Sequence, residues 1–277
     1  MAHAASHDSS DSDAGLAAAW GLPEVWRFGA VGSTNDLARR LAGSGAAAGC
    51  AVLADEQRAG RGRGGRGWFS PPGMGIWLSV VLRPAELPNP ALLPLWVGLA
   101  AARALDDYIP PPGVGIKWPN DLFHGGRKLG GILCEASWEG GTPVWVVAGI
   151  GVNLLQSEAD FPAPIRASAT SLRIASDRTL PLEEVAGALA GAVAEAGSGI
   201  PAALDATAAA ELAARDVLAG QLVEVRGGGE ALLSAGTALG IAPDGALLVR
   251  DRAGALRRVR EGSVRLAPSL LAAESRA

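Results

Sequence analysis

Two segments of the sequence carry residue types that could bind and activate an anionic substrate. The first, residues 57–68, is a glycine-rich loop that presents Arg61, Arg63 and Arg66 with no acidic residue among them. Guanidinium groups bind phosphate oxygens through paired hydrogen bonds, and glycines let the backbone close over the anion. The spacing G-x-G-x-x-G occurs twice, but the loop leads into Trp68 and a strand, whereas a dinucleotide fingerprint opens a helix. These residues favour a phosphate-bearing ligand outside a dinucleotide-binding fold.

The second segment contains both lysines of the chain. The sequence has 24 basic residues and uses arginine for all of them except Lys117 and Lys128. A compact ammonium differs from a planar guanidinium, so we expect lysine to be retained where a point charge is needed. Lys117 ends a short strand in front of the rigid Pro119 turn, where partial loss of water would strengthen its charge. We therefore predict that Lys117 is a functional lysine and not an ordinary surface residue.

A third segment, residues 148–154, has glycines at alternate positions of an apolar strand. Gly149 and Gly151 leave one face of that strand without side chains. Another group can then lie flat against the backbone, although a bulge or close packing of a helix would require the same pattern.

Hydrophobic periodicity indicates the elements that must hold these segments. A strand over 24–31 leads to a helix over 33–42, with Ser33 at the N-cap and Asp36 in the capping-box position. Strict alternation predicts a strand over 76–83, because every second residue is apolar. The other predicted elements are a strand over 50–55, a hairpin of 128–138 and 143–153, and helices over 90–108, 182–196 and 201–215.

The predicted organisation is two domains between two tails. Short alternating runs separated by glycine-rich turns begin near residue 217, which indicates a small β-barrel. The predicted divisions are a disordered tail over 1–19, a catalytic domain over 20–216, the barrel over 217–268 and a tail over 269–277.

Composition excludes several classes of protein. No apolar run reaches the roughly 20 residues of a membrane-spanning helix, and the first residues lack the pattern of a secretory signal, so we expect a cytoplasmic protein. The net charge of −4 argues against a chain that mainly coats nucleic acid. The two cysteines, Cys50 and Cys134, lie in apolar runs and are expected to be buried thiols.

In this order and spacing, the segments resemble the biotin protein ligase family. The matching residues are Ser33-Thr34-Asn35, Gln57 with the loop to Trp68, Lys117-Trp118-Pro119-Asn120-Asp121, Arg127 to Leu133, and Gly149 to Asn153. The resemblance covers about residues 24–266. It implies an α+β catalytic domain related to the class II aminoacyl-tRNA synthetase sheet, followed by an SH3-like barrel. It also implies a two-step reaction, in which biotin and MgATP give biotinyl-5'-AMP and the acyl group then passes to a carrier lysine.

The resemblance also implies the roles of individual residues. Lys117 and Arg63 would be catalytic, with Lys117 between the biotin carboxylate and the α-phosphate. The biotin-binding residues would be Ser33, Thr34, Asn35, Gln57, Arg61, Gly62, Arg63, Lys117, Gly130, Gly149 and Gly151. The residues for ATP and the adenylate would be Arg61, Arg63, Arg66, Trp68, Asn120, Lys128 and Asn153. ATP, biotin and Mg²⁺ are the implied small molecules, and the Mg²⁺ ligands are open, with Asn120 and Asp121 as candidates.

The implied partner is the biotin carboxyl carrier domain of acetyl-CoA carboxylase or a related carboxylase. Some family members carry an N-terminal helix-turn-helix, but the first family strand starts near residue 24 here, so we expect an enzyme without sequence-specific DNA binding or membrane binding. The oligomeric state is not predicted. Two alternatives remain open: a lipoate or octanoate ligase on the same fold, and a non-enzymatic Arg-Gly RNA-binding protein.

Overall fold

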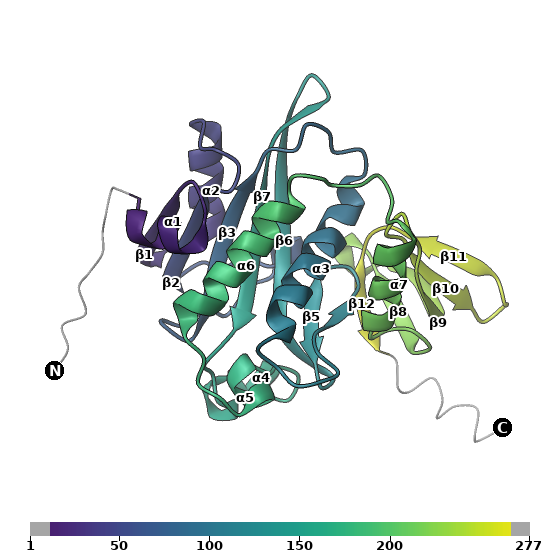
Figure 1. The fold of residues 1–277 in the computed structure, drawn as a ribbon. Helices are drawn as coiled ribbons and strands as arrows, with labels where there is room; N and C mark the ends of the chain where they lie inside the picture. The colour runs from purple at the N-terminus through teal and green to yellow at the C-terminus, as the bar shows by residue number, and fades with distance from the viewer. Residues whose placement is uncertain (1–11, 267–277) are drawn as a thin grey trace.

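The computed structural model describes residues 12–266 (Figure 1). Residues 1–11 of the tail expected over 1–19 lie outside the described residues, as does the whole tail expected over 269–277. The expected N-terminal tail is too long, however, because Ala14–Trp20 form helix α1. The Asp13 carboxylate accepts a hydrogen bond from the Leu16 N–H at 3.0 Å and so caps this helix, and the indole of Trp20 contacts Gly187. The helix has only seven residues, AGLAAAW, which is too short for its period to stand out next to the polar residues before it.

A seven-stranded mixed sheet forms the larger unit. Its strand order is β1-β2-β3-β7-β6-β5-β4, with β1 and β2 parallel and every other neighbouring pair antiparallel. The strands are β1 (Val25–Val31), β2 (Ala51–Gln57), β3 (Gly75–Leu82), β4 (Gly115–Lys117), β5 (Asp121–His124), β6 (Arg127–Glu139) and β7 (Thr142–Asn153). The expected α+β class, with a mixed sheet and packing helices, is confirmed.

Helices cover both faces of this sheet. Helix α2 (Thr34–Gly43) packs on one face, where Val81 and Val147 belong to a small cluster beneath it. The helices α3 (Leu93–Asp106) and α6 (Leu182–Ala196) pack on the other face, over Val80 and Ala148 of the same strands (Figure 1). Successive residues of a strand point to opposite faces, and helices cover both faces, so β3 and the central part of β7 are buried and mainly apolar.

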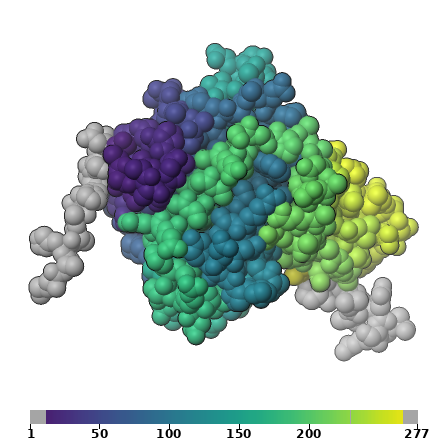
Figure 2. Space-filling view, in the orientation of Figure 1, coloured from purple at the N-terminus to yellow at the C-terminus, as the bar shows by residue number. Residues whose placement is uncertain are grey.

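The C-terminal unit is a five-stranded antiparallel sheet in the order β11-β10-β9-β8-β12. The strands are β8 (Leu222–Arg226), β9 (Leu232–Ile241), β10 (Leu247–Asp251), β11 (Leu256–Val259) and β12 (Ser263–Leu266). It lies beside the larger unit, at the yellow end of the chain in Figure 2. The buried indole of Trp118 donates to the Gly245 carbonyl at 2.9 Å and joins the two units. The boundary expected near residue 216 falls between α7 and β8, and it stays a prediction.

The connections account for the remaining differences from the sequence-based expectations. Helix α7 (Ala206–Arg215) begins at Asp205, which caps it, rather than at residue 201. The segment between β7 and α6 contains two short helices, α4 (Ala163–Arg166) and α5 (Leu172–Ser176). The sequence analysis did not predict them, because they are too short to show a hydrophobic period. Within the described part of the chain, no helix is long and apolar enough to cross a bilayer.

Candidate functional site

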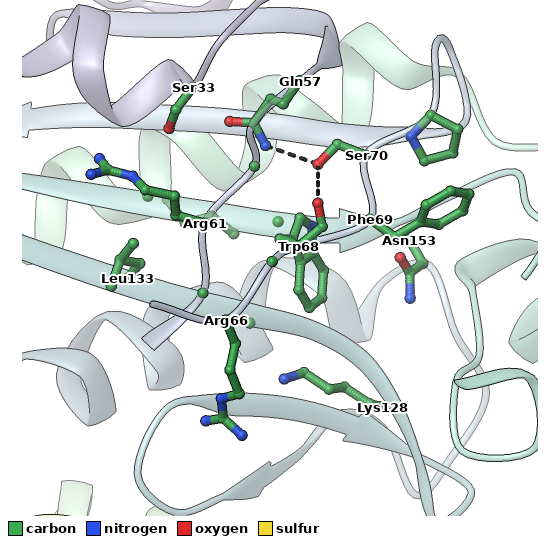
Figure 3. Close-up of a pocket in the computed structure, with 18 of the residues that line it drawn as sticks. Ser33, Gln57, Arg61, Arg66, Trp68, Phe69, Ser70, Lys128, Leu133 and Asn153 are labelled. Atoms are coloured by element: carbon green, nitrogen blue, oxygen red, sulfur yellow. Dashed lines mark hydrogen bonds between the residues drawn. The ribbon is translucent and has the colours of Figure 1, made fainter. Parts of the chain in front are cut away.

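A cavity of about 1030 Å³ opens above the centre of the large sheet (Figure 3). Its walls come from the start of α2, the loop that follows β2, the strands β6 and β7, and the segment 161–169. Most of the residues expected to bind a ligand line it: Ser33, Thr34, Asn35, Gln57, Arg61, Gly62, Arg63, Arg66, Trp68, Asn120, Asp121, Lys128, Gly149, Gly151 and Asn153. Residues from five separate segments of the sequence are thus brought to one place.

Short polar side chains at one end of the cavity form a connected network. Gln57 Oε1 accepts from the backbone N–H and the hydroxyl of Thr34, at 2.9 and 3.1 Å. Gln57 Nε2 donates to Ser70 Oγ at 3.0 Å, and Ser70 donates in turn to the Trp68 carbonyl at 3.2 Å (Figure 3). The Ser33 hydroxyl caps no helix N–H, although Ser33 occupies the expected N-cap position. Its hydroxyl is therefore not committed to the helix that it begins.

The glycine-rich loop is a small hairpin. The Gly62 N–H donates to the Arg66 carbonyl at 2.7 Å, and the Trp68 N–H donates to the Gly60 carbonyl at 2.8 Å. At its tip, Gly64 has a φ of 70°, a left-handed conformation that side chains disfavour.

The loop arginines have different partners. Arg61 binds Asp36 at 2.8 Å, so Asp36 pairs with this guanidinium instead of completing a capping box. Arg63 donates to the Gly262 carbonyl of the C-terminal unit, and burial lowers the pKa of its guanidinium. Arg66 Nε donates to the Arg63 carbonyl, which leaves its outer nitrogens at the cavity. Arg61 therefore pairs with carboxylates of the protein, and its expected contact with phosphate stays a prediction.

Lys128, and not Lys117, is the lysine at the cavity wall. The Lys128 ammonium lies 2.6 Å from Oδ1 of Asp121 and 5.2 Å from the ring centre of Trp68, a cation–π distance. Lys117 lies outside the cavity lining that the described residues form, and its ammonium lies 5.3 Å from the ring centre of Phe123. Burial lowers the pKa of Lys117, Lys128 lowers it further, and Asp121 opposes both. The sequence alone does not show which of the two lysines reaches the cavity, because that depends on how β5 turns into β6.

The alternate glycines of β7 leave room for side chains of the protein itself. A Cβ at Gly149 would lie 2.1 Å from Asn35 Oδ1, and one at Gly151 would lie 2.5 Å from Trp68 Nε1. The expectation of a group lying flat on this strand is therefore met by Asn35 and Trp68. The resemblance implies that Gly130 binds biotin, but Gly130 is not part of the cavity lining that the described residues form. A Cβ at Gly130 would meet the Gly151 carbonyl, and the neighbouring Gly131 lines the cavity.

Two buried asparagines fix the other end of the cavity. Asn120 Nδ2 donates to the Ile132 carbonyl at 2.7 Å, and Asn153 Nδ2 donates to the Thr170 carbonyl at 2.9 Å. The hydrogen bond from each amide to a backbone carbonyl holds the side chain at the cavity wall. The cavity also has an apolar lining that the sequence did not predict. Its residues belong to none of the motifs or periodic runs described above: Phe69, Phe161 and Ile165.

The two ends of the cavity differ in chemistry. One end offers neutral hydroxyl and amide groups above a glycine-bearing strand, which suits a small polar ring. The other end offers Lys128 and Arg66 near an aromatic ring, which suits phosphates and a flat base. Among residues 12–266, no group of three or more His, Cys, Asp or Glu side chains could hold a metal ion. Asp121 is a carboxylate on the wall that could meet an ion arriving with phosphates.

Comparison with known proteins identifies similar chains. Residues 30–153 match the model described as the biotin/lipoate A/B protein ligase family. The bifunctional ligase/repressor BirA of Bacillus spizizenii is 41% identical over 148 residues, which is 53% of this chain and 45% of that protein. The biotin--[acetyl-CoA-carboxylase] ligase of Mycobacterium tuberculosis is 40% identical over 149 residues, 51% of this chain and 52% of that protein. The chain thus matches about half the length of these curated relatives.

A solved structure extends the similarity to both units of the fold. The biotin protein ligase from Aquifex aeolicus, in complex with biotin and ATP, has a TM-score of 0.73 and 27% sequence identity. The match covers 88% of this chain and 99% of that one.

Proposed function

We propose that the chain is an ATP-dependent biotin ligase, because residues 30–153 match the model of the biotin/lipoate A/B protein ligase family. In this proposal it joins biotin to AMP and passes the biotinyl group to a lysine of a biotin carboxyl carrier domain. The two-ended cavity is the observation that carries the proposal. Its polar network lies near Gly149, through Asn35, and its cationic wall lies near Gly151, through Trp68 and Lys128.

Biotin fits the neutral end in this proposal. The ureido ring has one acceptor and two N–H donors, and the hydroxyl of Ser33 and the amide of Gln57 supply matching groups. The solved Aquifex ligase, which is in complex with biotin and ATP, supports biotin as the ligand. The biotin carboxylate would then point along the sheet toward Lys128.

ATP fits the cationic end. Lys128 would lie against the reacting carboxylate and the α-phosphate, where its positive charge stabilises the negative charge of the in-line attack. Arg66 and Arg63 would hold phosphate oxygens, and Asn153 and Trp68 would contact the base. No covalent enzyme intermediate is needed, because the biotin carboxylate attacks directly and pyrophosphate leaves.

Mg²⁺ would enter as part of the MgATP substrate. Asp121 is the carboxylate beside Lys128, and hard oxygen ligands of this kind suit Mg²⁺ bound mainly by phosphates and water. When bound, the ion would neutralise charge on the leaving pyrophosphate. Asp121 would hold it, and Asn120 would keep the neighbouring wall fixed through its bond to Ile132.

The proposed acceptor is a biotin carboxyl carrier domain, as the carboxylase in the names of the Mycobacterium and Paracoccus relatives indicates for those proteins. We propose that the enzyme is cytoplasmic. We also propose that it does not bind DNA sequence-specifically, since Arg61 and Lys128 are paired with carboxylates and the net charge is −4. Fluorescence anisotropy with the promoter DNA of biotin genes at about 150 mM salt should show no binding; tight binding would contradict this part.

Exchange of labelled pyrophosphate into ATP tests the proposed activity. The exchange should require biotin, and lipoate or octanoate should not replace it. Exchange with lipoate alone would favour the lipoate ligase, which belongs to the same family. No exchange with any of these acids would remove the enzyme proposal and leave the Arg-Gly RNA-binding alternative.

A further inference from the structure

Glu135 in β6 joins three parts of the molecule through one carboxylate. Its Oε2 accepts from Asn35 Nδ2 at 2.7 Å and from Arg61 at 3.2 Å, and its Oε1 accepts from Arg39 at 3.0 Å. The side chain is only 24% exposed. Glu135 lies outside the cavity lining that the described residues define, so it acts on that cavity through Asn35 and Arg61.

Glu135 fixes the orientation of the Asn35 amide. An ionised carboxylate only accepts hydrogen bonds, so it faces the NH₂ end of the amide. Asn35 Nδ2 also donates to the Leu133 carbonyl at 3.2 Å, and Oδ1 therefore accepts from Ser79 Oγ at 2.6 Å. Both Asn35 hydrogens are then used, and the amide oxygen lies over Gly149. A glutamine at 135 could donate instead and would remove the reason for this orientation.

The network that starts at Glu135 returns to the glycine-rich loop. Ser79 Oγ lies 2.8 Å from Thr34 Oγ1, and the backbone N–H of Thr34 donates to Gln57 Oε1 at 2.9 Å. Through Gln57 and Ser70 the network reaches the Trp68 carbonyl. Since Arg61 binds Glu135 directly, both ends of the loop hairpin are fastened to the same set of side chains.

The Glu135 carboxylate balances the positive charges of Arg39 and Arg61 together with Asp36. Asp36 and Glu135 face Arg39 and Arg61, two acids against two bases, with distances from 2.8 to 3.2 Å. Removal of one acid leaves a net positive charge beside the polar end of the cavity. Arg61 then keeps only Asp36, which it already shares with Arg39.

We propose that Glu135 is a positioning residue that holds Arg61 and Asn35 together and thereby keeps the loop closed over the biotin end of the cavity. The proposal rests on the proposed ligase function, because it assigns the carboxylate a part in biotin binding. Its structural consequence, a loop fastened before any ligand arrives, can be measured independently of activity.

The test compares Glu135→Gln with Glu139→Gln. Glu139 lies four residues further along β6 and is exposed, so the control repeats the same substitution on the same strand. Hydrogen exchange of the ligand-free protein reports the amides of Gly62 and Trp68, which close the hairpin. Biotin-dependent pyrophosphate exchange reports KM for biotin and for ATP.

The expected result is specific to position 135. Glu135→Gln should speed exchange of the loop amides and raise KM for biotin about tenfold or more, the scale of losing a hydrogen bond to a charged group. KM for ATP should change by less than about threefold, and Glu139→Gln should match the parent in every measurement. If Glu135→Gln does not fold, Glu135→Asp, which keeps the charge and loses reach, should show the same changes with smaller size.

Two results would overturn the proposal. Loop amides in a folded Glu135→Gln variant that exchange at the parent rate would show that the carboxylate does not fasten the loop. Faster exchange together with an unchanged KM for biotin would show that the fastening has no part in binding. A parent protein without biotin-dependent activity would instead refute the proposed function, and the amide exchange would still decide whether Glu135 holds the loop.

Discussion

The Lys128 ammonium donates to Oδ1 of Asp121 at 2.6 Å, and both side chains lie on the wall of the same cavity. The pair joins β5 to β6 next to the ring of Trp68. An arriving anion would compete with Asp121 for the ammonium, while a divalent cation bound to that anion would compensate the carboxylate. The arrangement therefore suits a ligand that brings both phosphates and Mg²⁺.

The first prediction separates the two lysines. Lys128→Ala should reduce biotin-dependent pyrophosphate exchange by about 10² or more, the scale of losing one charge-stabilising donor. Lys117→Ala should have a smaller effect, since its ammonium lies against Phe123 and outside the cavity lining of the described residues. Rates of exchange at saturating biotin and ATP provide the measurement.

Lys128→Arg serves as the charge-preserving control. A planar guanidinium does not reproduce a compact ammonium between two anions, so this variant should also lose most of its activity. If Lys117→Ala loses as much activity as Lys128→Ala while remaining folded, the original sequence-based assignment of Lys117 is the better one.

The second prediction concerns the glycines of β7. A Cβ at Gly149 would lie 2.1 Å from Asn35 Oδ1, so Gly149→Ala must displace the amide that Glu135 and Ser79 hold. Overpacking of this kind should destabilise the protein by about 1–3 kcal/mol and raise KM for biotin. Urea unfolding and biotin-dependent exchange measure the two effects.

Gly29→Ala is the matched control for Gly149→Ala. Gly29 also lies in a strand of the large sheet, but no atom lies within 4 Å of its added Cβ. This variant should keep or slightly increase stability, because alanine is less flexible than glycine in the unfolded chain. Equal changes in stability and in KM for biotin at the two positions would show that the contact between Asn35 and position 149 does not cause them.

Local patterns predicted the main elements, whereas the family resemblance supplied most of the residues that line the cavity. The period of β3 and β7, the glycines of β7 and the arginine-glycine loop needed no knowledge of the fold. The choice between Lys117 and Lys128 depends on how β5 turns into β6. The choice between Gly130 and Gly131 depends on which face of the sheet lies under the cavity. Glu135 was not found, because its partners lie from 74 to 100 residues away in sequence.

The third prediction concerns the thiols. Burial raises the pKa of Cys50 to about 12, and burial also raises that of Cys134 to about 12. Cys50 is fully buried as expected, whereas Cys134 is only partly buried against the core. At pH 8 the native thiolate fraction should be about 10³-fold lower than for an ordinary thiol near pKa 9, so iodoacetamide should label the unfolded chain far faster.

The raised thiol pKa also predicts a pH dependence of stability. Below pH 9 both states hold the protonated thiol, so its contribution is fully present; as pH rises from 9 toward 12, the unfolded state ionises first and the contribution is lost. The free energy of unfolding of the parent should therefore fall more steeply between pH 8.5 and about 10.5 than that of Cys50→Ala. Parallel curves for the two proteins would mean that Cys50 ionises equally in both states.

The last prediction concerns Arg63, which links the loop to the C-terminal unit through the Gly262 carbonyl. Burial disfavours its charge, and the nearby acids Glu261 and Asp121 partly compensate that cost. Arg63→Gly should release the loop from the C-terminal unit and weaken retention of biotinyl-AMP, which would then react with lysines of bystander proteins. Biotin labelling of added serum albumin measures this release.

Arg252→Gly is the control for Arg63→Gly, because Arg252 is an exposed arginine in the turn between β10 and β11 and lies outside the cavity lining of the described residues. It should label albumin no faster than the parent. The ligand-free loop of Arg63→Gly should also be cut by trypsin faster than that of the parent, and biotin with ATP should slow the cleavage in both. Equal albumin labelling by both variants and the parent would show that the contact with Gly262 does not retain the adenylate.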